Sequence, residues 1–600
     1  MHHKFRLGKT VYFIILFVLV FGVALEMVRS DYMLTISNFN ASKGSVEQGV
    51  TITELPESTI KNLTKNEFLI IYDKEDSSSI ALKQNITDTL GYMKKDVTEV
   101  PVESVPNTLD QYKSVMITFE AIERLPNLEL IEEYVSRGGK VFFAVRPAIG
   151  ASLYTIYRKL GMYEVGTFIT TKGISLTSTV LIQNDGLRME DDFLTNSALA
   201  VGLEQKSRVH VRSIEGVPLL WDVPYQDGRF MVFNGTMLTE KTNRGLIAGA
   251  ISFLNDDFLY PILNMKLAYI DGFPAPFPQG YDDEILQTYK RDIPAFYRDI
   301  WWPFIQQGAT KYNLNYTGAV IEAYNNMTKP PFEEAYQSQR ENVIKYGREL
   351  LKSGGEIGIN GYNHVPLVIK GDEMKNSDLP AWDSEVEMAK SLAEVSQFLK
   401  RAFPVYSFVT YVPPGNMLSE EGKNAIENSI SSVEIISSSY LGGEEFVVEE
   451  PFTYLPRITS GYEYTNENKW GLANSITSVG VFSHVITPGE VLSSNESWAF
   501  LSKSYSRMLQ DVQAGFPWLR SMTTSAAAEQ LETYTNTDVY IEETENSLDV
   551  YLSHFKDEFY FLLRTDRSIT SIKNATLAKI DDDVYMIKAN DITLEIGLDD

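Results

Sequence analysis

An apolar run near the N-terminus places the strongest constraint on this chain. Residues 11–28 contain a single charged side chain, Glu26, and the uncharged core reads VYFIILFVLVFGVAL. This length matches the roughly 17–25 residues of a membrane-spanning helix. Basic residues precede the run, at Lys4, Arg6 and Lys9. Positive charge on the cytoplasmic side therefore predicts a cytoplasmic N-terminus, with residues 31–600 outside the membrane.

The same run has a second interpretation, a secretory signal peptide that is cleaved. The sequence Ala24-Leu25-Glu26 is a poor match to a small-x-small cleavage site, which favours an uncleaved anchor. We therefore expect residues 1–30 to form a cytoplasmic tip and a transmembrane helix in a single-pass protein of the cell membrane. Both interpretations export the rest of the chain.

The composition limits the chemistry of the exported part. The 600 residues include no cysteine, which excludes disulfides, thiol nucleophiles and thiolate metal sites. A net charge of −27 argues against nucleic acid as a partner. This negative charge is typical of a well-solvated acidic surface, and it also allows a cationic partner such as a partly deacetylated amino-sugar polymer.

Residues 31–257 predict a spacer followed by an α/β domain. Residues 31–65 are rich in Ser, Thr and Asn, as in a spacer. From residue 66 onward, strand patterns at 68–73, 114–119 and 140–145 alternate with helical patterns at 80–93 and 128–137. This alternation predicts a doubly wound parallel sheet.

The segment EEYVSRGGKVFFAV, and the strand FMVFNGTML followed by the helical GLIAGAISFL, resemble class I glutamine-amidotransferase-like domains over residues 66–257. Amidotransferase catalysis needs a cysteine nucleophile, which this chain lacks. The resemblance therefore implies a fold, with a structural or docking role, and no amidotransferase activity. At the other end of the chain, residues 526–600 contain short alternating strands separated by turn residues, which predicts a small β-sandwich.

Residues 261–525 contain four strand patterns that end in polar or turn residues. KLAYIDGF delivers Asp271, GGEIGINGYNHVPL delivers Asn360 and His364, FVTYVPPGNM ends in Pro-Pro-Gly, and SVGVFSHVITPGE carries His484. In barrels of alternating strands and helices, functional groups lie on the loops after the strands. We therefore expect these positions to converge on one face.

These four motifs resemble the polysaccharide deacetylase family, carbohydrate esterases with a distorted (β/α)₇ barrel. The resemblance implies that an Asp and two His hold a divalent ion, that a second Asp is the base and that a distant His is the acid. His364 then matches a metal ligand, and His484 matches the acid. Asp271 matches either a metal ligand or the base. The YIDGF motif is similar to that of Pel-type exopolysaccharide deacetylases, and the whole arrangement is similar to uncharacterised bacterial proteins linked to exopolysaccharide production.

The motifs depart from the family pattern at several positions. Asn360 stands where the first metal histidine is expected, and an amide oxygen is a poor replacement for imidazole. If Asp271 is the base, Phe273 replaces the metal aspartate; if Asp271 is the metal ligand, Ile270 replaces the base. Val412 stands in place of the arginine that orients the base.

Two functional interpretations and a weaker third follow from these motifs. We favour a degenerate deacetylase that binds carbohydrate through Asn360, Tyr362, His364 and Tyr411, without a cofactor. The alternative is an active deacetylase of N-acetylated exopolysaccharide, with Asp271 and His364 holding a zinc-like ion and Asp271 and His484 catalysing. Its missing ligand would come from residues such as Asp282, Asp283 or Glu284. The weakest interpretation is a scaffold for a polysaccharide synthase complex.

Each site residue also has a structural interpretation. Histidines after loops are often hydrogen-bonded parts of the core, and Asp271 could cap a turn with Gly272. Aromatic side chains suited to stacking on sugar rings are Trp301, Trp302, Tyr362, Tyr411, Trp470 and Trp498.

Overall fold

The computed structural model of the chain describes residues 53–599, except residues 62, 64, 66, 275–278, 371–378 and 439–442. Most of the predicted spacer and the predicted transmembrane helix lie outside the described residues. None of the described helices is long and apolar enough to cross a membrane. The chain divides into two compact units, of which the smaller contains Gly272–Pro274 and Gly318–Glu434 and the larger contains Val50–Asp271, Ala275–Thr317 and Ile435–Asp600.

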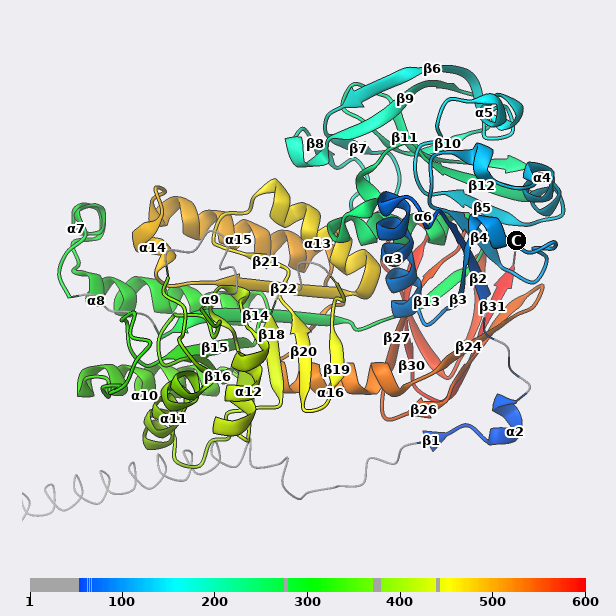
Figure 1. Cartoon of the computed structure of the whole chain (residues 1–600). Coiled ribbons are helices and arrows are strands. Elements are labelled where there is room, and N and C mark those ends of the chain that lie inside the picture. Colours follow the sequence, from blue (N-terminus) through cyan, green and yellow to red (C-terminus); the bar gives the residue numbers. More distant parts are fainter. Residues whose placement is uncertain are drawn as a thin grey trace, which may run out of the picture. The chain divides into compact units, whose positions relative to one another are not determined.

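The first part of the larger unit is built on a nine-stranded sheet in the order β3-β2-β4-β5-β12-β11-β10-β7-β8 (Figure 1). Its parallel strands are β2 (Glu67–Tyr72), β3 (Asp96–Pro101), β4 (Ser114–Ile117), β5 (Lys140–Phe143) and β12 (Gly228–Phe233). Four antiparallel strands extend the sheet: β11 (Pro218–Tyr225), β10 (Arg208–Arg212), β7 (Ile174–Leu176) and β8 (Arg188–Met189). The strands predicted up to residue 145 are confirmed, whereas the antiparallel extension was not predicted.

The order of the parallel strands creates a topological switch point. The first strand of this sheet in the sequence, β2, lies between β3 and β4. The chain runs from β2 to β3 on one side and from β4 to β5 on the other, so the connections after these two neighbouring strands leave in opposite directions. The helices α3 (Ser77–Tyr92) and α4 (Leu128–Ser136) confirm the two helical patterns. Ligands of open α/β sheets bind outside the carboxyl ends of the strands at such a point.

Helix α6 (Arg244–Leu254) is largely apolar on every face because it is buried on all sides. All eleven of its residues are buried, as expected for a helix enclosed by protein on all sides. It packs on α13 (Asn466–Val479), and a Cβ atom at Gly245 would lie 2.3 Å from the Cα atom of Asn474. Glycine is therefore required at this close approach between two distant segments of the chain.

The end of the larger unit contains two four-stranded antiparallel sheets. One has the order β13-β27-β30-β29 and the other β24-β25-β31-β28. Their strands are β13 (Phe258–Ile262), β27 (Phe559–Arg564), β30 (Val584–Ala589), β29 (Ala575–Lys579), β24 (Val539–Glu543), β25 (Ser547–Leu552), β31 (Thr593–Asp599) and β28 (Ser568–Lys573). The alternating patterns correctly predicted strands here, but β13 comes from before the deacetylase-like region.

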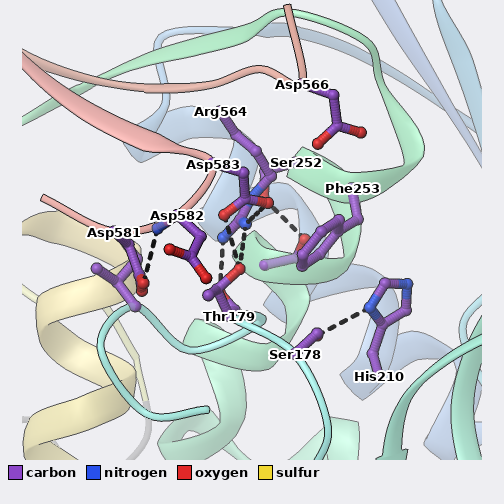
Figure 2. A network of polar contacts seen from close by, with 12 residues as sticks. Ser178, Thr179, His210, Ser252, Phe253, Arg564, Asp566, Asp581, Asp582 and Asp583 are labelled. Atoms are coloured by element: carbon purple, nitrogen blue, oxygen red, sulfur yellow. Dashed lines mark hydrogen bonds and ion pairs between the residues drawn. The ribbon is translucent and has the colours of Figure 1, made fainter. Parts of the chain in front are cut away.

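A buried arginine joins these sheets to the α/β part (Figure 2). The guanidinium of Arg564 donates to Thr179 Oγ1 at 2.8 Å, to Ser252 Oγ at 2.9 Å and to Asp583 Oδ2 at 2.6 Å. It also lies 4.0 Å from the ring centroid of Phe253. Its remaining nitrogen, Nη2, donates to the carbonyl oxygen of Thr179 at 2.7 Å. Because every nitrogen of this buried cation is used, the network fixes the sheet that contains β27 against α6.

The predicted deacetylase-like strands are present at β14 (Met265–Phe273), β16 (Glu356–Gly361), β17 (Thr410–Tyr411) and β22 (Val481–Ile486). In the larger unit β14 pairs parallel with β22, and β22 pairs parallel with β21 (Thr459–Ser460). In the smaller unit β16 neighbours β15 (Tyr316–Ile321) and β17. The helices of that unit include α10 (Gln337–Lys352), α11 (Glu385–Ala402) and α12 (Glu420–Ser429).

Candidate functional site

Asp271, near the end of β14, is held by a cation that the sequence analysis missed. Arg457 Nη2 lies 2.5 Å from Asp271 Oδ2, and the guanidinium lies over the ring of Tyr269. Asp271 Oδ1 has no hydrogen-bond partner among the described residues. Burial raises the pKa of Asp271 above its ordinary value, and the guanidinium of Arg457 opposes that rise only in part.

The donor set around Asp271 does not fit a divalent cation. Arg457 occupies one carboxylate oxygen of Asp271, so only Oδ1 could face an ion. Within the part of the chain that the structure describes, no three His, Asp or Glu side chains are grouped so that they could hold a metal ion. Asp282, one of the substitute carboxylates, instead accepts a hydrogen bond from Ile285 N and caps the helix that includes Asp283 and Glu284.

His484 is buried on β22 with both ring nitrogens occupied. Its Nδ1 lies 2.7 Å from Thr459 Oγ1 and its Nε2 lies 2.8 Å from the carbonyl oxygen of Gly461. The carbonyl can only accept, so Nε2 carries the proton and Nδ1 accepts from the threonine hydroxyl. Burial lowers the pKa of His484 to about 4. The ring thus ties neighbouring segments of the larger unit together.

In the smaller unit, the polar side-chain atoms of Asn360 and Tyr362 also form hydrogen bonds with other protein groups. The Asn360 amide accepts from Gly272 N at 3.3 Å and donates to the carbonyl oxygen of Val412 at 2.6 Å. The hydroxyl of Tyr362 donates to the carbonyl oxygen of Glu333 at 3.0 Å. Both side chains are buried. Their polar atoms therefore hold strand ends in place.

His364 and Tyr411, in the same unit, have polar side-chain atoms without a hydrogen-bond partner among the described residues. No hydrogen bond joins the half-buried ring of His364 to another described residue, and burial lowers its pKa. The hydroxyl of Tyr411 is buried without a hydrogen-bond partner in the described part of the chain, and burial raises its pKa. These two groups are the predicted binding residues that still have unused polar atoms.

A buried carboxyl of the smaller unit was not predicted. Glu322 follows β15, and its Oε1 accepts from Ala335 N at 3.2 Å while its Oε2 has no partner among the described residues. Burial raises the pKa of Glu322 to about 8, so the carboxyl is protonated at neutral pH. Its position after a strand is the signal that could have identified it.

A cavity of about 1000 Å³ lies within the larger unit. Its walls come from the first turn of α3, the residues after β4, the segment between β12 and α6, and one face of α13. The segment 456–460 also lines it, and this segment contains both the Arg457 that pairs with Asp271 and the Thr459 that bonds His484. Of the predicted aromatic residues, Trp470 lines the cavity, whereas Trp301, Trp302 and Trp498 are buried among other rings.

A serine, a histidine and an aspartate form a further chain of hydrogen bonds. Ser178 Oγ lies 2.9 Å from His210 Nδ1, and His210 Nε2 lies 2.7 Å from Asp222 Oδ1. Figure 2 marks the contact between Ser178 and His210. The imidazole is fully buried against Phe253, and burial lowers its pKa. In a serine hydrolase, Nε2 of the histidine faces the serine and Nδ1 faces the aspartate, which is the opposite order. We therefore interpret these hydrogen bonds as part of the protein core.

Comparison with solved structures finds a deacetylase-like fold. The structure described as Agd3, a novel carbohydrate deacetylase, aligns with a TM-score of 0.52 and 9% identity, over 89% of this chain and 99% of that chain. The chain thus has the mixed α/β structure and curled half-barrel sheet of a deacetylase-like fold.

Two other solved structures align over smaller parts. A mutant of a CE4 family pseudoenzyme with restored enzymatic activity has a TM-score of 0.26 and 8% identity, over 44% of this chain and 68% of that chain. A ThuA-like protein from Bacteroides uniformis has a TM-score of 0.24 and 12% identity, over 32% of this chain and 92% of that chain. Scores this low do not establish a common fold.

Comparison with curated protein sequences gives no significant match. The profile of one protein family matches residues 13–197 and 188–586, which together span most of the sequence. The chain therefore belongs to the family described as uncharacterised protein conserved in bacteria (DUF2194).

Proposed function

We propose that this protein is a membrane-anchored, extracytoplasmic carbohydrate-binding protein with a degenerate deacetylase centre, acting in the synthesis or export of an exopolysaccharide. The observation that carries the proposal is that both ring nitrogens of His484, the residue that matches the acid, are bonded to Thr459 and Gly461. The family resemblance makes Asp271 a metal ligand or a base, and its pair with Arg457 leaves only one carboxylate oxygen, Oδ1, for either role.

The chemical argument concerns the proton transfers that deacetylation needs. A metal-dependent deacetylase needs a divalent ion that polarises the acetyl carbonyl and lowers the pKa of a bound water. A base then removes the proton from that water and an acid protonates the leaving amine. Here both ring nitrogens of His484 are bonded to Thr459 and Gly461, so the acid position has no free nitrogen for the leaving amine.

The deacetylase-like fold supports carbohydrate as the ligand class, because the neighbour that covers most of this chain is itself described as a carbohydrate deacetylase. Exopolysaccharide, the membrane anchor and a partner synthase complex remain predictions from the sequence. Protease added to cells stripped of their wall tests the topology: we expect degradation of the part after residue 30, and complete protection would contradict it.

The catalytic part of the proposal is tested with the purified chain and N-acetylated oligosaccharides. We expect no stoichiometric divalent metal by elemental analysis and acetate release at background. Acetate release that is abolished by Asp271→Asn or His364→Ala would show an active deacetylase with a rebuilt metal site. Binding of oligosaccharide without acetate release would support the proposal.

A further inference from the structure

We infer that the cavity in the larger unit, at the switch point of the nine-stranded sheet, is a binding site for an uncharged or amine-bearing oligosaccharide. This inference rests on the proposed function and assigns its ligand to a site that the deacetylase motifs do not include. The cavity volume of about 1000 Å³ is at the upper end of the roughly 300–1,000 Å³ of small-molecule sites, which leaves room for several sugar rings.

The position of the cavity follows from the topology of the sheet. The chain leaves β2 for the start of α3, where Asp76 and Ser78 line the cavity, and leaves β4 at Thr118 and Glu120, which also line it. These are the carboxyl ends of the two neighbouring strands whose connections diverge. The cavity thus occupies the usual ligand position of an open α/β sheet.

The charges around the cavity argue against a phosphate ligand, which this position binds in many nucleotide-binding folds. Asp76 already places its carboxylate at the start of α3, where it accepts from Ser78 N at 2.9 Å. The loop 73–79 reads DKEDSSS and contains no glycine. Five carboxylates line the cavity against three cationic side chains.

The three cationic side chains also have protein partners. Arg244 lies within ion-pair distance of Asp88 and Glu445, and Arg457 pairs with Asp271. Lys241 donates to the carbonyl oxygen of Glu444 at 2.9 Å. A phosphate or carboxylate ligand would therefore enter a site with an excess of negative charge.

The remaining polar side chains suit sugar hydroxyls. Thirteen of the 29 lining residues carry a hydroxyl or an amide. No hydrogen bond joins some of these hydroxyls to another described side chain or backbone group, namely those of Ser78, Thr236, Thr242 and Ser460. A hydroxyl without a partner can both donate and accept a hydrogen bond, as hydroxyl-rich ligands require.

An exposed aromatic ring completes the site. Phe193, in the short helix η4 (Asp192–Leu194), lines the cavity with 41% of its surface exposed. Exposing a phenyl ring to water is unfavourable, and a sugar ring with an apolar face can cover it. Buried Arg457, which also lines the cavity, has two nitrogens, Nε and Nη1, without an acceptor among the described residues.

The test measures binding by calorimetry with the full chain. The probes are tetramers and hexamers of N-acetylglucosamine, of galactosamine and of glucosamine, together with inorganic phosphate. We expect at least one oligosaccharide to bind and Phe193→Ala to weaken its affinity at least tenfold. Phe500→Ala is the matched control, because Phe500 is 42% exposed on α15 (Trp498–Gly515) and does not line the cavity; this variant should bind like the unmodified chain.

The other outcomes separate the inference from the proposed function. If His364→Ala or Tyr411→Phe weakens binding and Phe193→Ala does not, the cavity is not the site, while carbohydrate binding stands. If no oligosaccharide binds the unmodified chain, both the inference and the carbohydrate-binding proposal are wrong. Binding of phosphate in competition with the sugars would overturn the ligand class.

Discussion

The deacetylase motifs and the cavity wall differ in how their polar side chains are used. Asp271, Asn360 and His484, which match catalytic or metal positions, have most of their polar atoms bound to protein groups. The cavity wall instead includes Ser78 and Ser460, whose hydroxyls bind no described group. A side chain that performs chemistry or recognition needs unused donors or acceptors. The contrast supports the proposal that recognition, and not hydrolysis, is the retained function.

The largest effect is expected at the ion pair. Arg457→Met leaves the buried carboxylate of Asp271 without its cation, and removing one partner of a buried pair costs about 3–5 kcal/mol of unfolding free energy. Denaturant unfolding measures the loss. The double variant Arg457→Met, Asp271→Leu removes both charges and should regain most of it. A single variant as stable as the unmodified chain would mean that Asp271 is free for another role.

The next effect is a pH dependence from His484. Its pKa is about 4 in the folded chain, below the ordinary 6.5, so the unfolded state binds a proton that the folded state does not. Stability should be fully present above pH 6.5 and fall as the pH drops from 6.5 to 4, by about 3 kcal/mol at 1.36 kcal/mol per pH unit. His484→Gln should show a smaller loss over this range. An identical pH profile in the two proteins would contradict the buried, neutral histidine.

A smaller effect is expected at Asn360. Asn360→Ala removes its bonds to Gly272 and Val412 and should cost about 2 kcal/mol, because the buried backbone groups lose their partners. Asn360→His restores the residue type of the deacetylase motif. It should also be destabilised and should release no acetate, since both ring nitrogens of His484 remain bonded to protein groups. Acetate release by Asn360→His would show that the centre is one substitution away from activity.

The smallest effect on stability is expected at the cavity wall. Ser460→Ala removes an exposed hydroxyl that bonds no described group, so the unfolding free energy should change by less than about 0.5 kcal/mol. The affinity for the bound oligosaccharide should nevertheless fall by about two- to tenfold, the effect of one lost hydrogen bond. Equal affinity would remove Ser460 from the site.

The sequence predicted the elements better than the site. Strand β2 contains the continuous apolar run FLIIY, and α4 ends shortly before the Gly138-Gly139 pair, so local patterns sufficed. The partner of Asp271 is Arg457, which lies 186 residues away and belongs to no motif, so only the tertiary structure reveals it. The antiparallel strands β10 and β11 lie inside residues 66–257, but the amidotransferase-like resemblance implies a parallel sheet and therefore did not indicate them.

The placement of β13 has a consequence for how the protein is made. Its five residues are all buried, and Phe258 at its start pairs with Arg564 at the end of β27. A ribosome adding about 5–20 residues per second needs roughly 15–60 s to produce the intervening segment. During that time β13 is an unpaired apolar strand, and such edges promote aggregation. Any shortened chain that stops before Phe559 keeps this edge open permanently, so fragments for expression should either include β27 or begin after β13.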